Sequence, residues 1–267
     1  MKKISYIYIF FIFSLSNCVQ THKHYTAEMT ITPDVIESKK PAELTFQIKN
    51  PKGDKISDLE IVHEKPMHLF IVSDDLAQYF HEHPTKQNDG TYKVPFTFPE
   101  GGKYKVFVDF KPKDDEQTTE SFDVDVLGER HTSIDLRPSS DFEYINEGIK
   151  VVMKPRGKLV KQQDLMLDFQ VFDANTNEPV NDLQNYLGAK AHFVIIRKGL
   201  NRFVHAHPMT AEDMQNSNSP MKMETKDSES KVSAMVNFPN SGIYKIFAQF
   251  KRNNKVITVS FVFKVSG

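Results

Sequence analysis

The chain has 267 residues, which is enough for two ordinary domains. Hydrophobic residues make up 39% of it and charged residues 26%, a balance that is typical of a folded globular protein and excludes a disordered one. The formal net charge is −1, and no basic patch is interleaved with aromatic residues, so we exclude nucleic acid as a partner.

Residues 1–18 have the features of a secretory signal. Two lysines precede the apolar run Ile4–Leu15, which is too short for a comfortable transmembrane span. The run ends in the letters LSNC, which resemble a bacterial lipobox, in which the cysteine is lipid-modified and becomes the first mature residue. Asn17 departs from the usual small residue before Cys18, so a plain secretory peptide with an incidental cysteine remains an alternative.

We therefore expect a bacterial cell-envelope protein, periplasmic or on the outer surface, held to the membrane by lipid at Cys18. The polar residues 19–27 predict a short tether after this anchor. Because Cys18 is the only cysteine, the mature chain has no internal disulfide and each domain depends on its apolar core.

Residues 28–128 predict the first domain. Their apolar residues alternate with polar ones in short runs, with turn sequences between the runs and no helical periodicity. Short strands at this spacing predict a β-sandwich. The expected strands in this domain, outside the histidine hairpin, are 29–31, 44–48, 59–62, 92–98, 104–110 and 122–126.

The pattern is interrupted at 129–148, which we interpret as an interdomain linker, and it is repeated over 149–267. Several segments agree in the same order, which predicts an internal duplication and therefore an all-β chain of two tandem β-sandwich domains. The matching segments are Leu44–Ile48 with Leu167–Val171, Phe98–Phe107 with Phe238–Phe247, and Phe122–Val126 with Phe261–Val265.

A histidine motif marks the first domain. Residues 67–72 and 78–83 predict two strands joined by a tight turn at 73–77. If the hairpin is centred on the Asp74–Asp75 bond, His68 lies directly opposite His81. Because strand residues alternate between faces, His83 shares the face of His81, and three imidazoles converge. The register is critical, since a slip of one residue would move His68 to the other face.

The second domain repeats the motif, with His192 placed thirteen residues before His205 and followed by His207. Here the predicted hairpin centre falls on Lys198–Gly199, where glycine suits a two-residue turn. We therefore predict one three-histidine cluster in each domain.

Three neutral imidazoles are a suitable ligand set for copper or zinc, with one coordination position left open. Four methionines in 209–230 favour copper, because thioether sulfur suits cuprous copper, although they are equally explained as loop and packing residues. In the first domain His63 and Glu64 could supplement the cluster, whereas Leu187 and Gly188 occupy the corresponding region of the second.

The segments Met67–Val72, His81–Pro84 and Phe98–Tyr104 together resemble a domain of bacterial envelope proteins, the YtkA-like and related sandwiches. The resemblance covers both repeats and implies an immunoglobulin- or cupredoxin-like fold, an envelope location and, for some members, copper handling. The second repeat departs from the pattern at Ala191, which replaces the methionine, and in the insertion after Pro208.

No nucleophile elbow, phosphate loop or His-Glu-x-x-His motif is present, so we expect no enzyme. The favoured hypothesis is an envelope lipoprotein that binds or buffers a transition metal, copper first and zinc second. The alternative is a surface adhesion or interaction module that contacts an envelope protein and has structural histidines. A metal-dependent hydrolase or oxidase would need an acid or base such as Glu64 or Glu82.

Overall fold

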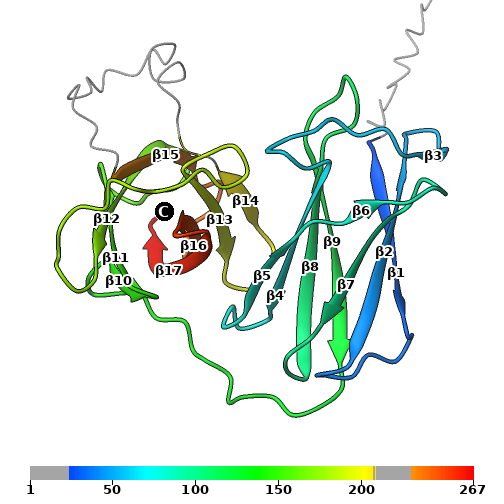
Figure 1. Ribbon diagram of the computed structural model, residues 1–267, viewed down its shortest axis with the longest axis horizontal. Helices are drawn as coiled ribbons and strands as arrows, with labels where there is room; N and C mark the ends of the chain where they lie inside the picture. The colour runs from blue at the N-terminus through cyan, green and yellow to red at the C-terminus, as the bar shows by residue number, and fades with distance from the viewer. Residues whose placement is uncertain (1–23, 207, 209–229) are drawn as a thin grey trace, which may run out of the picture.

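The computed structural model describes residues 24–206, 208 and 230–267. The described chain is all-β and forms two β-sandwiches that lie side by side (Figure 1), which confirms the predicted fold class. The predicted signal and lipid anchor at Cys18, the residue His207 and the methionine-containing segment 209–229 lie outside the described residues. Within the described residues, no helix is long and apolar enough to cross a membrane.

Two antiparallel sheets make up the first sandwich. One sheet contains β1 (Thr26–Thr32), β2 (Pro41–Lys49), β7 (Tyr92–Thr97) and β6 (Thr85–Lys86), with β3 (Lys55–Ile56) paired to β2. The other has the order β5 (Tyr79–Glu82), β4 (Met67–Ser73), β8 (Gly102–Phe110) and β9 (Thr118–Val126). The predicted strand 59–62 does not form. This run makes only isolated bridges, because the chain reverses direction in a tight turn between Val62 and Lys65.

The second sandwich also has two antiparallel sheets, and one of them repeats the order β5-β4-β8-β9 of the first. One sheet contains β10 (Glu143–Asn146), β11 (Ile149–Pro155), β12 (Asp164–Asp173) and β15 (Lys231–Asn237). The other has the order β14 (Phe203–Ala206), β13 (Ala191–Arg197), β16 (Gly242–Arg252) and β17 (Lys255–Val265), which parallels β5-β4-β8-β9. The matching strand order agrees with a duplication. The duplication itself stays a prediction, and so do the domain boundaries.

The central strands β4 and β13 are buried on both faces. In β4, Leu69 and Ile71 point into the core of the first sandwich, while Phe70 and Val72 point to the second sandwich. This two-sided burial explains why the sequence of β4 is a nearly continuous apolar run, which is unusual for antiparallel strands with one wet face.

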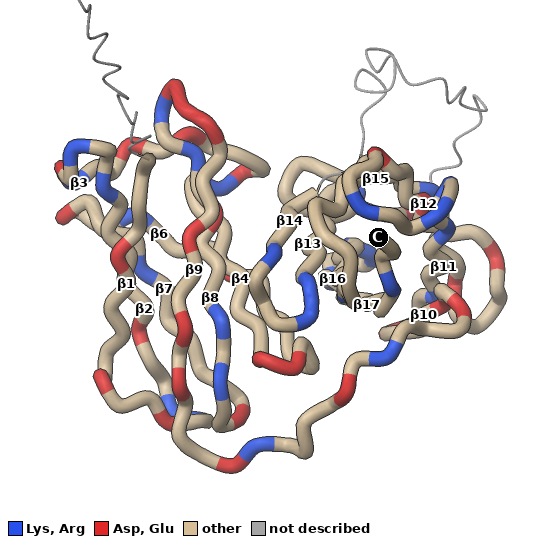
Figure 2. The backbone as a smooth tube through the Cα atoms, turned by 180° about the vertical axis from the view of Figure 1, so that it is seen from behind, with Lys and Arg blue, Asp and Glu red and all other residues tan. Residues whose placement is uncertain are grey.

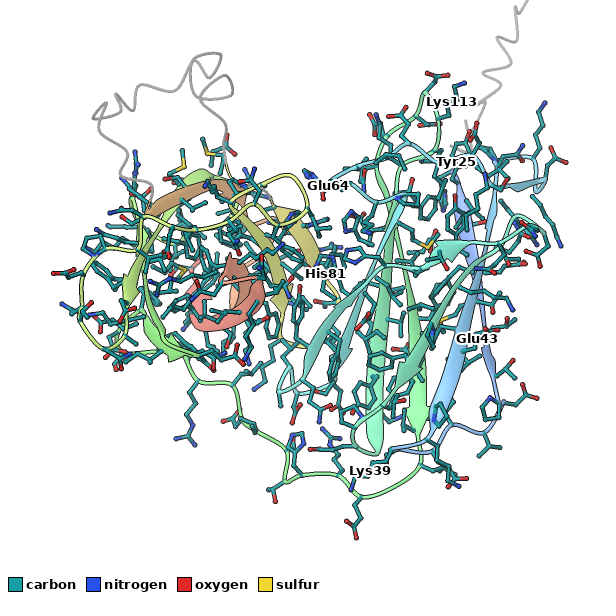
Figure 3. The ribbon with its side chains drawn as sticks, viewed as in Figure 1. Tyr25, Lys39, Glu43, Glu64, His81 and Lys113 are labelled. Carbon is teal, nitrogen blue, oxygen red and sulfur yellow. The ribbon has the colours of Figure 1, made fainter. Side chains whose placement is uncertain are left out.

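The face between the sandwiches is an apolar cluster with several stacked rings. Tyr79 stacks on Phe247 with ring centroids 4.3 Å apart, and Phe107 stacks on Phe203 at 4.7 Å. Figure 3 shows His81 among the side chains that meet between the sandwiches. The cluster contains Phe70, Val72, Leu76, Phe107, Leu136, Val194, Ile196 and Phe247.

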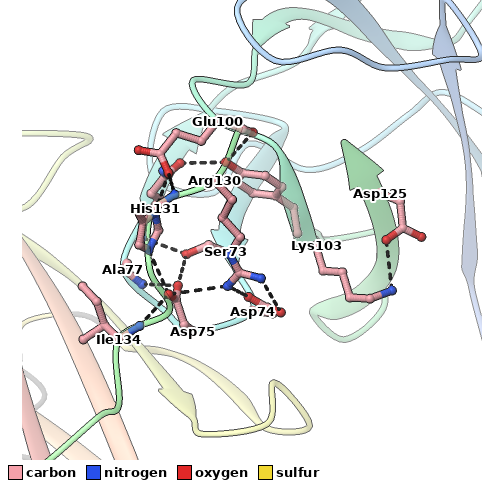
Figure 4. Close-up of polar contacts among 12 residues, drawn as sticks. Ser73, Asp74, Asp75, Ala77, Glu100, Lys103, Asp125, Arg130, His131 and Ile134 are labelled. Carbon is pink, nitrogen blue, oxygen red and sulfur yellow. Dashed lines mark hydrogen bonds and ion pairs between the residues drawn. The ribbon is translucent and has the colours of Figure 1, made fainter. Parts of the chain in front are cut away.

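The linker runs from the end of β9 across one end of the molecule to β10, with acidic and basic residues along it (Figures 1 and 2). It is fastened to the β4–β5 turn by the buried carboxylate of Asp75 (Figure 4). This carboxylate accepts hydrogen bonds from the Ile134 amide at 3.1 Å and from Nε2 of His131 at 2.9 Å. Nδ1 of His131 donates to Glu100, and Arg130 pairs with Asp74.

The charges of this network stabilise one another. Burial alone would raise the pKa of Asp75, but hydrogen bonds from Ser73, Ala77, Ile134 and His131 together lower it. Hydrogen bonding to Glu100 and then to Asp75 raises the pKa of His131 above its ordinary value.

We expect the imidazole of His131 to titrate above about pH 6.5, the value of a free histidine. Because its pKa is raised in the folded state, its contribution to stability is complete below about pH 6.5 and disappears as the pH rises through the folded pKa. An NMR titration of His131 measures this directly. In Glu100→Ala the hydrogen bond that is the largest cause of the shift is removed, so the pKa should move back towards 6.5; an unchanged pKa would contradict the assignment.

The apolar cluster between the sandwiches should contribute to the free energy of unfolding. Phe247 is 3% exposed, so Phe247→Ala should leave a cavity between the sandwiches and lower the free energy of unfolding by about 3 kcal/mol. Chemical denaturation measures the change. The control Tyr144→Ala removes a ring that is 39% exposed, and it should change stability by less than about 0.5 kcal/mol.

Candidate metal centre

The first histidine hairpin forms with its centre one residue later than predicted. Phe70, rather than His68, lies directly opposite His81, and four residues separate Ser73 from Gln78. The Ser73 hydroxyl accepts a hydrogen bond from the Gln78 amide at 2.9 Å, and this bond helps to hold the four-residue turn. The register differs from the prediction by two residues, so His68 keeps its face and the expected convergence still occurs.

The second hairpin differs from its prediction in the same way. His205 lies opposite Val194, and the turn between Arg197 and Arg202 has four residues instead of the predicted two. The turn contains two consecutive residues with positive φ, Gly199 at 89° and Leu200 at 59°. An offset of two residues again leaves His192 on the face of His205.

The three predicted histidines of the first domain form a cluster. Nδ1 of His68 lies 3.1 Å from Nε2 of His81, and one ring nitrogen from each of the three histidines lies within 4.8 Å of the others. The ring centroids of His81 and His83 are 4.6 Å apart. Among the described residues, Nε2 of His83 is buried and has no hydrogen-bond partner.

The neighbouring acceptors determine which nitrogens carry protons. Nε2 of His68 lies 2.9 Å from the carbonyl oxygen of Val62, and a carbonyl only accepts, so this nitrogen is protonated. Nδ1 of His81 lies 2.8 Å from Oε1 of Gln249 and is protonated for the same reason. In neutral imidazoles the other nitrogens hold lone pairs, so Nδ1 of His68 and Nε2 of His81 present two lone pairs to each other.

The described histidines of the second domain join the same group and do not form a separate cluster. The rings of His192 and His205 are 6.0 Å apart, while His205 is 5.5 Å from His68 and His192 is 6.1 Å from His81. Nε2 of His192 donates to the carbonyl of Tyr186 at 3.0 Å, just as His68 donates to Val62. His207 lies outside the described residues.

His63 belongs to this group as well, whereas Glu64 is exposed. Both residues have positive φ in the two-residue turn between Val62 and Lys65, and the turn directs the His63 ring to 5.3 Å from that of His192. The second domain has the same turn between Tyr186 and Ala189, with Leu187 and Gly188 at its centre, as the sequence comparison suggested.

Two hydrogen bonds between the sandwiches fix the first histidine of each His-x-His pair. Nδ1 of His81 donates to Gln249 of β16, and Nδ1 of His205 donates to the carboxylate of Asp109 of β8, both at 2.8 Å. The two acceptors are at equivalent positions, because Asp109 pairs with His68 across β4–β8 and Gln249 pairs with His192 across β13–β16. Each sandwich therefore holds a histidine of the other.

Comparison with known proteins gives a family for this chain. The family described as a domain of unknown function, DUF8832, matches residues 20–128 and 144–267, which is most of the sequence. The chain belongs to the DUF8832 family. No curated protein matches this family member.

Solved structures with similar folds include two bacterial adhesins. Escherichia coli FdeC has a TM-score of 0.27 and 15% identity, over 90% of this chain and 64% of that one. Yersinia pseudotuberculosis InvE has a TM-score of 0.29 and 10% identity, over 91% of this chain and 61% of that one. The DUF8832 chain thus spans about three-fifths of these adhesin structures, and likenesses at these TM-scores carry no inference about function.

Burial keeps the clustered imidazoles of this DUF8832 protein neutral. Desolvation lowers the pKa of His68 to about 4, and desolvation with the nearby His68 lowers the pKa of His83 to about 3. Desolvation, with the nearby His205, also lowers the pKa of His192 to about 3. The pKa of His81 falls well below its ordinary value, first through burial and then through His83. Neutral imidazole is the form that binds a metal ion.

Sequence reasoning missed Asp109 and Gln249, although both leave a signal. Each is a lone polar residue in an apolar run, VFVDF in β8 and IFAQF in β16, at matching positions of the two repeats. A buried polar side chain needs a hydrogen-bond partner, so each of the two residues indicates that a polar group from another part of the molecule contacts the sheet there.

Without metal, the unfolding free energy should fall as the pH is lowered from about 7 to 5, because unfolded histidines take up protons near 6.5 while His68 and His83 do not. The unfolded chain binds more protons in this window, so acid favours it. Denaturant titrations with a chelator present measure the slope. The double variant His68→Gln/His83→Gln should show a smaller slope, and an equal slope would contradict the assignment.

Proposed function

We propose that this protein is a cell-envelope lipoprotein that binds or buffers a transition metal, copper or zinc, at His68, His81 and His83. The observation that supports it is the facing pair of lone pairs on His68 and His81, 3.1 Å apart. Two lone pairs at this distance repel each other, and a cation bonded to both nitrogens, off the line that joins them, replaces the repulsion with two bonds.

The donor set suits such an ion. The 3.1 Å separation is shorter than two zinc–nitrogen bonds, each about 2.0–2.1 Å, so one ion can bond to both nitrogens. The buried Nε2 of His83 supplies a third nitrogen, and a further position remains for water or another side chain. Three imidazoles suit copper and zinc alike, so the preference for copper depends on the methionines of 209–230.

The envelope location in this proposal is supported by the sequence of residues 1–18. A basic start, an apolar run and a terminal cysteine are the order of a lipoprotein signal, and the lipid at Cys18 would be the contact with the membrane. A metal site in the envelope would meet copper or zinc as they enter or leave the cell.

The proposal assigns binding and not catalysis. Alternation along β5 places Glu82 on the face opposite to His81 and His83, and Glu64 is exposed at the turn that precedes the site. Neither carboxylate is therefore placed beside the three nitrogens as a general acid or base.

A second candidate is a surface adhesion or interaction module with structural histidines. It is favoured by the bonds from His68 to Val62 and from His192 to Tyr186, because buried histidines bonded to backbone are common in stable cores. However, metal-ligating histidines also donate their second nitrogen to a backbone carbonyl or carboxylate. The cluster lies between the sandwiches and outside both sandwich cores, so this bond pattern fits both functions.

A titration with Zn²⁺ and with copper ions tests the proposal. The wild-type protein should bind, and His81→Ala/His83→Ala should lower the affinity by more than about 100-fold, since losing two ligands exceeds the effect of losing a supporting residue. The matched control is His24→Ala, which removes an exposed histidine far from the cluster in sequence and should bind as the wild type does.

Undiminished binding by the folded double variant, with a circular dichroism spectrum like that of the wild type, would refute the proposed site. If the wild type binds metal and the double variant does not, elemental analysis of the protein purified from its native envelope identifies the ion.

A further inference from the structure

We propose that Gln249, a residue of the second sandwich, is a positioning residue for the metal site of the first sandwich. Through it the site becomes competent only when the two sandwiches are docked. This inference rests on the proposed metal binding by His68, His81 and His83.

Gln249 is held firmly where its amide can act on His81. Its side chain is on β16 and is 6% exposed, and its Oε1 lies 2.8 Å from Nδ1 of His81. Its Nε2 donates to Oγ1 of Thr258 at 3.2 Å, so both ends of the amide are hydrogen-bonded. Thr258 is directly opposite Gln249 across β16–β17, so the sheet itself holds this contact in place.

The hydrogen bond selects the tautomer of His81. With Oε1 of Gln249 as acceptor, the proton is on Nδ1 and the lone pair on Nε2 points at His68. Without that acceptor, the proton moves to Nε2 and His81 donates to Nδ1 of His68. The two histidines then satisfy each other, and a metal ion must break their hydrogen bond before it can bind.

The equivalent position of the first sandwich supports this role. Asp109 accepts from Nδ1 of His205 at 2.8 Å and is itself oriented by Thr119, whose Oγ1 donates to it at 2.8 Å. The residue pairs Asp109–Thr119 and Gln249–Thr258 are thus the same device placed once in each sandwich. A carboxylate or carbonyl oxygen that accepts from the second nitrogen of a histidine and so orients it is the common support of metal-ligating histidines.

The test compares the wild type with Gln249→Leu and Gln249→Glu in the full-length protein. Titration with Zn²⁺ should show an affinity about 10–100-fold lower in Gln249→Leu. Gln249→Glu keeps an acceptor for Nδ1 and should restore binding. Nitrogen-15 NMR of the imidazoles, without metal, should show His81 protonated on Nδ1 in the wild type and in Gln249→Glu, and on Nε2 in Gln249→Leu.

The outcomes separate this inference from the proposed function. Wild-type affinity in Gln249→Leu would overturn the role of Gln249 while leaving metal binding intact. A wild-type His81 protonated on Nε2 would also overturn it, and this measurement needs no variant to fold. Absence of Zn²⁺ and copper binding by the wild type would instead refute the proposed function, and the inference with it.

Discussion

Two hydrogen bonds between the sandwiches, from His81 to Gln249 and from His205 to Asp109, are the constraint on which the arrangement of the molecule depends. The surrounding apolar cluster drives association, but apolar burial has no direction and permits many relative placements. A buried polar group left unpaired costs more than the bond itself contributes. Only the placement that pairs both histidines at once avoids this cost, so the two bonds fix the relative position of the domains.

Much of the first histidine cluster could be predicted because strand geometry tolerates the error that was made. The predicted hairpin centre lies one residue too early, which shifts the pairing by two residues, and a shift of two returns every side chain to its original face. The pairing partner of His81 was therefore wrong, while its shared face with His68 and His83 was right. In β4 and β13 the apolar runs also indicated strands, since only strands of this length fit between the flanking turns.

The joining of the two histidine sets could not be predicted in the same way. Periodicity assigns a residue to a face of its own sheet, but it does not say which other surface covers that face. The alternate residues Phe70 and Val72 show that the outer face of β4 is buried, and nothing local identifies β13 and β14 as the cover. His63 illustrates the point, because its ring reaches His192 only through the docking of the other domain.

The two equivalent acceptors, Gln249 and Asp109, differ in charge, and the buried carboxylate of Asp109 favours a cation nearby. Gln249 is uncharged, and although its hydrogen bond raises the pKa of His81, burial outweighs that bond and keeps the imidazole neutral. Asp109 is 1% exposed, and among the described residues its ion-pair partner is His205, which is charged only when protonated. Asp109 lies directly opposite His68 across β4–β8, so its buried carboxylate would attract a metal ion held at the three histidines.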